Sequence, residues 1–202
     1  NFLMLNLFEA STQKEKSLND LLSGHLFDLS LHGGKDSDCR YQKESGGKFK
    51  SNGLYIRDLG YFDTAHFYDL DKQGAYFISR SKSNQNYYAK DEKGEYEKIN
   101  VEAYLPNTDE QVELRDVYVG TAKKRVKVRL IMERVPENVL QKRMAKLKRA
   151  SSKQSKRQIS AERRKMSQYN IFITNTAEEG LPMDQIRMVY TLRWKIELIL
   201  KI

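Results

Sequence analysis

The sequence is poor in the residues that would indicate a secreted, fibrous or membrane protein. Its single cysteine, Cys39, excludes an internal disulfide framework and a metal site built from several cysteines. Three prolines and 11 glycines in 202 residues exclude a collagen-like or linker-like chain. No apolar run approaches about 20 residues, and the opening NFLMLNLFEA lacks the basic start of a signal peptide. We therefore expect a reduced, cytoplasmic protein with no membrane partner, built as one domain or one domain with an insertion.

Positive charge is concentrated in one part of the chain. Between Glu137 and Gln168 there are eleven basic residues and two acidic ones, so this stretch carries the whole net charge of +9. Such a one-sided field indicates a polyanionic partner, most simply nucleic acid. The alternative is a solvated helix face without a ligand. The basic residues are Lys142, Arg143, Lys146, Lys148, Arg149, Lys153, Lys156, Arg157, Arg163, Arg164 and Lys165.

The pattern of apolar and turn residues predicts an α/β protein. A strand at 54–56, a helix at 64–72 and a strand at 75–79 form a βαβ unit, which favours parallel pairing of the two strands. Alternating stretches between 99 and 135 predict antiparallel strands of an inserted sheet. The other predicted elements are short strands at 18–22 and 25–31, a short helix within 36–47, a loop or hairpin at 84–98, a basic helical segment from Pro136 with a flexible middle at Ser151-Ser152, a strand at 170–174 and a last helix from Pro182 to the chain end. Residues 1–13 match no clear pattern.

The last helix carries polar groups on an otherwise apolar surface. At 100° per residue, Tyr190, Arg193 and Glu197 fall within about 60° of one another, and Lys201 joins the same stripe. A helix that is apolar almost all round is buried, so the polar side chains of this stripe must face a cleft or pair with one another. The simplest structural alternative is an ion pair between Arg193 and Glu197 at i, i+4 spacing.

Asp58 is the second candidate functional residue. It directly follows the predicted strand at 54–56, where α/β sheets present ligand groups, although an Asp-x-Gly turn would explain it equally. Together, Asp58 and Glu197 suggest a carboxylate site for Mg²⁺ or Mn²⁺. Two such ions about 3.5–4 Å apart would activate the attacking oxygen and stabilise the leaving oxygen of a phosphodiester.

These residues resemble a known family. The spacing Tyr190-x2-Arg193-x3-Glu197 resembles the Y-x2-R-x3-E-x6-K signature of DDE transposases of bacterial insertion sequences, and Asp58-Leu59-Gly60-Tyr61-Phe62 resembles their D-x-G-Y/F motif. The DLLSG, AYFISR and FITN segments occur in the same order, so the resemblance covers most of residues 14–202.

The resemblance implies a ribonuclease H-like mixed sheet with helices, interrupted by a β-rich insertion. Residues 1–83 would begin the catalytic core, 84–168 would form the insertion with its basic helical extension, and 169–202 would supply the last core strand and the helix bearing the catalytic Glu. Asp58 and Glu197 would be catalytic metal ligands, and Tyr190 and Arg193 would contact DNA phosphate. The implied activity is metal-assisted cleavage at transposon ends and strand transfer to target DNA, by a dimer associated with the bacterial nucleoid.

Two departures from the family pattern are visible. The first catalytic Asp has no counterpart, since Glu9 lies too close to the predicted hairpin, and the final Lys of the signature would fall at position 204, beyond Ile202. We therefore expect a fragment that is inactive alone. The alternative is a basic nucleic-acid-binding module without catalysis, in which Asp58 and Glu197 lie apart or form salt bridges.

Overall fold

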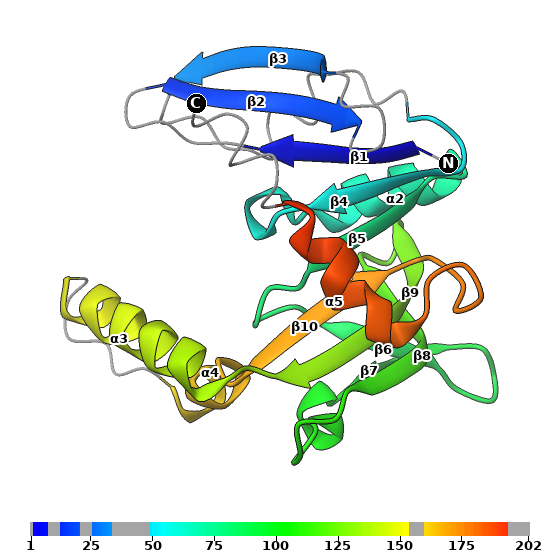
Figure 1. Cartoon of the computed structure of the whole chain (residues 1–202). Coiled ribbons are helices and arrows are strands. Elements are labelled where there is room, and N and C mark those ends of the chain that lie inside the picture. The colour runs from blue at the N-terminus through cyan, green and yellow to red at the C-terminus, as the bar shows by residue number, and fades with distance from the viewer. Residues whose placement is uncertain (1, 8–12, 21–25, 34–48, 154–159, 194–202) are drawn as a thin grey trace.

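The fold is described from a computed structural model for residues 2–7, 13–20, 26–33, 49–153 and 160–193 (Figure 1). Its centre is one sheet of ten strands in the order β3-β2-β1-β4-β5-β10-β9-β8-β6-β7. The strands are β1 (Phe2–Leu7), β2 (Gln13–Asp20), β3 (Leu26–Gly33), β4 (Gly53–Arg57), β5 (Tyr76–Arg80), β6 (Tyr87–Lys90), β7 (Tyr96–Ile99), β8 (Val112–Gly120), β9 (Arg125–Arg134) and β10 (Tyr169–Thr174). The helices are α2 (Thr64–Lys72), α3 (Glu137–Lys153), α4 (Ala161–Met166), α5 (Met183–Thr191) and the 3₁₀ turns η1 (Leu59–Tyr61) and η2 (Val101–Tyr104). The predicted α/β class is confirmed, and the mixed sheet with helices is consistent with the ribonuclease H-like fold of DDE transposases.

The βαβ unit forms as its sequence predicts. β4 pairs in parallel with β5, and α2 connects them. The Asp63 side chain accepts a hydrogen bond from the Ala65 backbone N–H at 2.9 Å and so caps the start of α2. Gly74, just beyond the helix end, has a φ of +69°, a conformation that glycine adopts without strain.

The N-terminal strands extend the sheet on the β4 side. β2 and β3 form the predicted antiparallel pair, although β2 begins earlier than expected and ends at Asp20. β1, which the sequence did not predict, lies between β2 and β4 and runs parallel to β4, with Leu5 opposite Ile56. The carboxyl ends of β1, β4 and β5 therefore meet at one edge of the sheet. The helix predicted within 36–47 lies outside the described residues.

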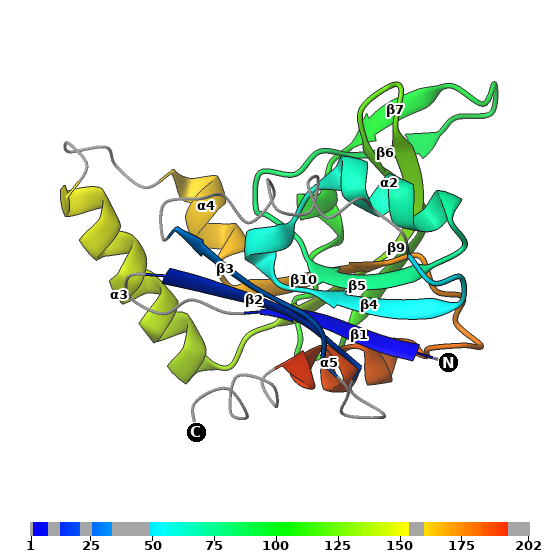
Figure 2. The same cartoon turned by 90° about the horizontal axis from the view of Figure 1, so that it is seen from above.

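The strands between residues 84 and 135 continue the same sheet. β6 and β7 form the hairpin, and β8 and β9 pair antiparallel as predicted. They do not form a separate sheet, because β9 pairs with β10, and β10 in turn pairs antiparallel with β5. α3 runs through Ser151-Ser152 and projects away from the sheet (Figures 1 and 2). The division into a core and an insertion stays a prediction.

Helices cover both faces of the sheet (Figure 2). On one face α2 packs through Phe67, whose ring stacks on Phe77 of β5 with centroids 4.5 Å apart. On the other face α5 packs Ile186 and Tyr190 against apolar side chains of β4, β5, β9 and β10. The sheet core between them fixes the position of α5 relative to the end of β4. None of the helices in the described part of the chain is long and apolar enough to cross a membrane.

Two polar side chains, those of Arg129 and Asn175, hold the connection that leads into α5. The buried Arg129 of β9 donates from Nη1 to the carbonyl oxygen of Leu181 at 2.8 Å, in the loop before the helix. Asn175 of the FITN segment accepts from the Phe77 backbone N–H at 2.9 Å and donates to the Ala75 carbonyl oxygen at 3.0 Å. Because these bonds satisfy buried backbone groups, they fasten the β10–α5 connection to β5 and β9.

Candidate active site and nucleic-acid interface

Asp58 lies at the carboxyl edge of the sheet, directly after β4. Its backbone begins the η1 turn, and its Oδ2 accepts a long hydrogen bond of 3.4 Å from the Gly60 backbone N–H. The Asp-x-Gly turn considered from the sequence is therefore present. It leaves the side chain about one-third exposed, so the carboxylate remains accessible to a ligand.

The C-terminal end of α5 brings two residues of the predicted stripe onto this carboxylate. Tyr190 Oη lies 3.5 Å from Asp58 Oδ1, and Arg193 Nη1 lies 3.4 Å from the same oxygen. Tyr190 and Arg193 are both buried, while the Phe172 ring of β10 packs edge-on against Tyr190. Residues 132 or more positions apart in the sequence thus meet, a contact that the sequence did not predict; the predicted contact of Tyr190 and Arg193 with DNA phosphate stays a prediction. Glu197 and Lys201 lie outside the described residues, so the distance from Asp58 to Glu197 stays untested.

The environment of Tyr190 keeps its hydroxyl protonated. Burial, and then the negative charge of Asp58, raise the pKa of Tyr190 to about 12, although the charges of Arg193 and Arg80 oppose the shift. A neutral phenol is a hydrogen-bond donor near the carboxylate across the physiological pH range. Tyr190 and Arg193 therefore hold the Asp58 side chain through its Oδ1 atom.

The residue before Asp58 is anchored on the other face of the sheet. Arg57 is buried and donates from Nη2 to Nε2 of His66 on α2 at 3.0 Å. Burial, and then the nearby positive charge of Arg57, lower the pKa of His66 to about 2, so the imidazole is neutral and accepts this bond. His66, which the sequence gave no role, thereby ties α2 to the strand end that presents Asp58.

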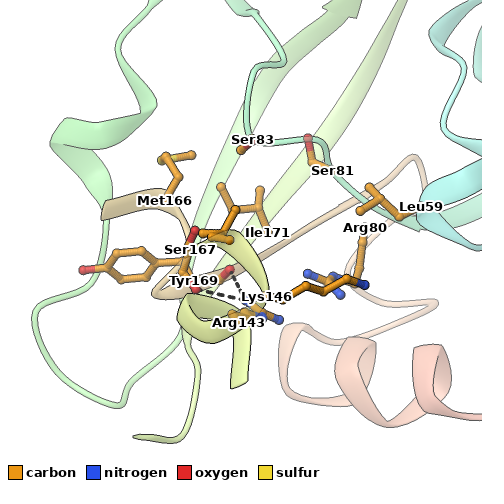
Figure 3. Close-up of a pocket in the computed structure, with 11 residues that line it drawn as sticks. Leu59, Arg80, Ser81, Ser83, Arg143, Lys146, Met166, Ser167, Tyr169 and Ile171 are labelled. Carbon is orange, nitrogen blue, oxygen red and sulfur yellow. Dashed lines mark hydrogen bonds between the residues drawn. The ribbon is translucent and has the colours of Figure 1, made fainter. Parts of the chain in front are cut away.

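A pocket of about 340 Å³ opens beside the Asp58 turn (Figure 3). Leu59, which follows Asp58, lines it together with Arg80 of β5 and the α3 residues Arg143 and Lys146. Arg80 was recognised only as the end of the AYFISR segment. The sequence does carry a signal for Arg80: it is a basic residue at the end of β5, the strand that pairs with β4.

The predicted basic residues fall into two groups where the structure describes them. Arg143 and Lys146 line the pocket, whereas the others project from α3 and α4 into solvent, and Lys165 forms an ion pair with Glu102 at 3.2 Å. The exposed side chains are those of Lys142, Lys148, Arg149, Arg164 and Lys165. Lys156 and Arg157 lie outside the described residues, and the side chains of Lys153 and Arg163 are not placed.

The described residues hold only part of a metal site. Among the side chains that the structure describes, no group of three His, Cys, Asp or Glu converges. β1, the parallel neighbour of β4, has the sequence FLMLNL and contributes no carboxylate next to Asp58. The chemistry of Asp58 suits a hard divalent cation, but further carboxylate ligands would have to come from segments such as the one containing Glu197.

Comparison with known proteins agrees with these motifs. A family model described as a transposase DDE domain matches residues 17–202. The chain is 34% identical over 197 residues to the transposase of insertion sequence IS231F from Bacillus thuringiensis subsp. israelensis, covering 90% of this chain and 41% of the relative. It is 31% identical over 198 residues to the IS1151 transposase of Clostridium perfringens, covering 91% and 41%. The chain thus spans about two-fifths of the length of these relatives.

Proposed function

The chain belongs to the DDE transposase family, and from this premise we propose that it is the catalytic part of an enzyme that cleaves and joins DNA at the ends of an insertion element. The single observation that carries the proposal is the meeting of Tyr190 and Arg193 with Asp58 at the carboxyl edge of the sheet. In the proposal the domain acts on DNA in the bacterial cytoplasm, as a dimer on two element ends.

Asp58 and Glu197 are the proposed metal ligands. Glu197 follows Arg193 by four residues, the spacing of about one helical turn, and Arg193 is the residue that contacts Asp58. Mg²⁺ or Mn²⁺ ions held there would supply Lewis-acid stabilisation of the phosphodiester oxygens. The protein's own contribution is to hold the Asp58 carboxylate through Tyr190 and Arg193, and in the proposal these two residues also contact DNA phosphate.

The exposed basic side chains of α3 and α4 are the proposed DNA grip. Both helices also contribute to the pocket next to Asp58, α3 through Arg143 and Lys146 and α4 through Met166. Lys and Arg that neutralise phosphates bind DNA without reading its sequence, with an affinity that falls steeply with salt. This grip would hold the substrate while the carboxylates act on one phosphodiester.

A second function has a specific observation in its favour. β1 has no acidic residue, and Asp58 is the one carboxylate that the described residues place at the site. A domain with too few carboxylates would bind DNA without cutting it. The two functions differ in whether Glu197 is needed for chemistry.

The proposed catalysis is tested by Glu197→Ala in a full-length transposase that carries this domain. We expect loss of strand transfer, by at least about 10³-fold because metal-ligand carboxylates act in the transition state, with DNA affinity within about twofold. Glu179→Ala is the matched control, since Glu179 is exposed in the loop before α5. Strand transfer retained by Glu197→Ala would refute the assignment.

The proposed DNA grip is tested by charge reversal on α3 and α4. The triple variant Lys142→Glu, Arg149→Glu, Arg164→Glu should bind duplexes of unrelated sequence at least about tenfold more weakly at 50 mM salt, because each lost phosphate contact removes about 0.9 from the salt slope. Lys93→Glu, Lys98→Glu, Lys123→Glu serves as the control of equal charge, on the exposed part of the β-rich region. Equal affinities for the two triple variants would remove α3 and α4 from the binding surface.

A further inference from the structure

The pocket beside Asp58 combines a cationic side with an apolar side. Arg80, Arg143 and Lys146 supply the positive charge, and Leu59, Met166 and Ile171 supply apolar surface (Figure 3). Arg80 of β5 precedes Arg143 and Lys146 of α3 by more than sixty residues in the sequence. The described side chains that line the pocket include no carboxylate. A concave site with this lining favours an anion attached to an apolar group.

Arg143 is held in place by the protein itself. Its Nη1 donates to the carbonyl oxygens of Tyr169 at 3.0 Å and Ser167 at 3.2 Å, and its Nη2 donates to Asn170 Oδ1 at 2.5 Å. The Asn170 amide in turn donates to the buried Glu133 carboxylate at 2.7 Å. Arg143 therefore adds a fixed positive charge to the pocket wall, and the nearby charge of Glu133 offsets part of it.

Arg80 is the cation that the protein leaves for a ligand. Among the described residues its guanidinium has no hydrogen-bond or ion-pair partner, and its Nε is buried. Arg80 also lies close to Arg143. Burial of Arg143, and then the positive charge of Arg80, lower the pKa of Arg143 to about 10. Two like charges kept together around a pocket are costly unless an anion lies between them.

We propose that this pocket binds a backbone phosphate of the DNA strand that passes Asp58, with Arg80 and Lys146 contacting the phosphate and the apolar wall contacting the attached sugar. The inference rests on the proposed function, since it places the substrate strand of that reaction. It adds Arg80 as a binding residue. The guanidinium fork suits a phosphate oxygen pair, whereas Lys146 on the exposed rim supplies a point charge.

The test measures DNA binding by the 202-residue chain in EDTA, so that metal-dependent chemistry plays no part. A fluorescent 30-base-pair duplex is titrated in 50–200 mM salt with wild type, Arg80→Gln and Arg80→Lys. We expect Arg80→Gln to weaken binding about tenfold and to reduce the salt slope by about 0.9, the loss of one phosphate contact. Arg80→Lys should recover part of the affinity. Lys93→Gln, an exposed charge in the β6–β7 turn, should change affinity less than twofold.

A second measurement identifies the contact as one particular phosphate. Duplexes carrying a single neutral methylphosphonate at successive positions are compared for wild type and Arg80→Gln. At one position, or two adjacent ones, the substitution should weaken wild type but leave Arg80→Gln unaffected. Thermal unfolding of both proteins confirms that the variant is folded.

The outcomes separate this inference from the proposed function. Wild-type affinity and slope in folded Arg80→Gln, or equal sensitivity of both proteins at every methylphosphonate, would overturn the phosphate pocket. Neither result bears on whether Glu197 is required for strand transfer. Conversely, a domain that binds DNA through Arg80 but retains activity in Glu197→Ala would keep the pocket and lose the catalytic assignment.

Discussion

Two carboxylates on the α5 face of the sheet have opposite environments. Glu133 of β9 is nearly fully buried and accepts short hydrogen bonds from Asn170 at 2.7 Å and Gln111 at 3.0 Å, with Arg187 at 3.6 Å. Asp58 is one-third exposed, and its three contacts are all 3.4–3.5 Å long. Protein groups satisfy the hydrogen-bonding capacity of the buried Glu133, whereas Asp58 is held only by long contacts and can still bind a ligand.

The difference separates a structural acid from a functional one. A buried carboxylate must be satisfied by its neighbours, because a lone buried charge is expensive. Glu133 meets that need and, through Asn170, positions Arg143 in the pocket wall. Asp58, at a strand end on the edge of the sheet, is about one-third exposed and has only long contacts with the protein. The following predictions test this contrast, beginning with the largest effect.

The isosteric exchange Glu133→Gln should destabilise the fold strongly. The new amide group would face the amide donors of Gln111 or Asn170, so at least one buried donor loses its acceptor. We expect the free energy of unfolding to fall by about 2–3 kcal/mol. Asp58→Asn is the matched exchange and should cost about 1 kcal/mol or less, because its contacts are long and the side chain is partly hydrated. Urea unfolding of both variants measures the difference, and equal losses would abolish the contrast between the two acids.

Lowering the pH should reduce the free energy of unfolding through His66, which ties α2 to the strand end that presents Asp58. The folded-state pKa of about 2 lies below the ordinary value of 6.5, so the stabilisation is complete above pH 6.5 and is lost as the pH falls below it. The expected loss is about 1.4 kcal/mol for each pH unit below 6.5, because the unfolded chain binds a proton at His66 that the folded protein excludes. The measurement is urea unfolding at pH 7.5, 6.5 and 5.5, with His66→Gln as the control, which keeps an acceptor but does not titrate. Parallel pH profiles for the two proteins would show that His66 does not carry this dependence.

The smallest effect concerns the tyrosine that touches Asp58. The absorbance titration of wild type minus that of Tyr190→Phe should show a phenol with a pKa near 12. In an Asp58→Asn background that pKa should fall, because the neighbouring negative charge is one of its causes, while burial keeps it above 10. A Tyr190 pKa that is the same in wild type and in the Asp58→Asn background would mean that Tyr190 does not face Asp58.

Local sequence signals predicted the elements of the fold well. The Asp63 cap, the Gly74 stop and the apolar strand residues on either side of them specify β4, α2 and β5 through short-range physics. β1 was missed because its six residues form a strand through pairing with β4, a long-range interaction that leaves no local signal. The strands between residues 84 and 135 were predicted from local patterns, but their continuity with the central sheet, which also depends on long-range pairing, was not.

The sequence predicted the motif residues of the site but not the residues that surround them. Asp58, Tyr190 and Arg193 carry a recognisable spacing, and the structure brings them together. Arg80 and Glu133 read as ordinary strand residues, because their roles depend on which side chains the sheet register places opposite them. The β9–β10 register places Glu133 opposite Asn170 of β10. The β5–β10 register places Arg80 opposite Phe172, two residues after Asn170 on β10.

The most direct test is the separation of the Asp58 and Glu197 carboxylates in a crystal structure of the chain grown with Mn²⁺. Mg²⁺ and ions of similar size bind carboxylate oxygens at about 2.0–2.1 Å, so two ligands of one ion have oxygens no more than about 4 Å apart. The account predicts such a pair, with Tyr190 and Arg193 still on Asp58. A Glu197 carboxylate on the opposite side of the molecule from Asp58 would contradict it.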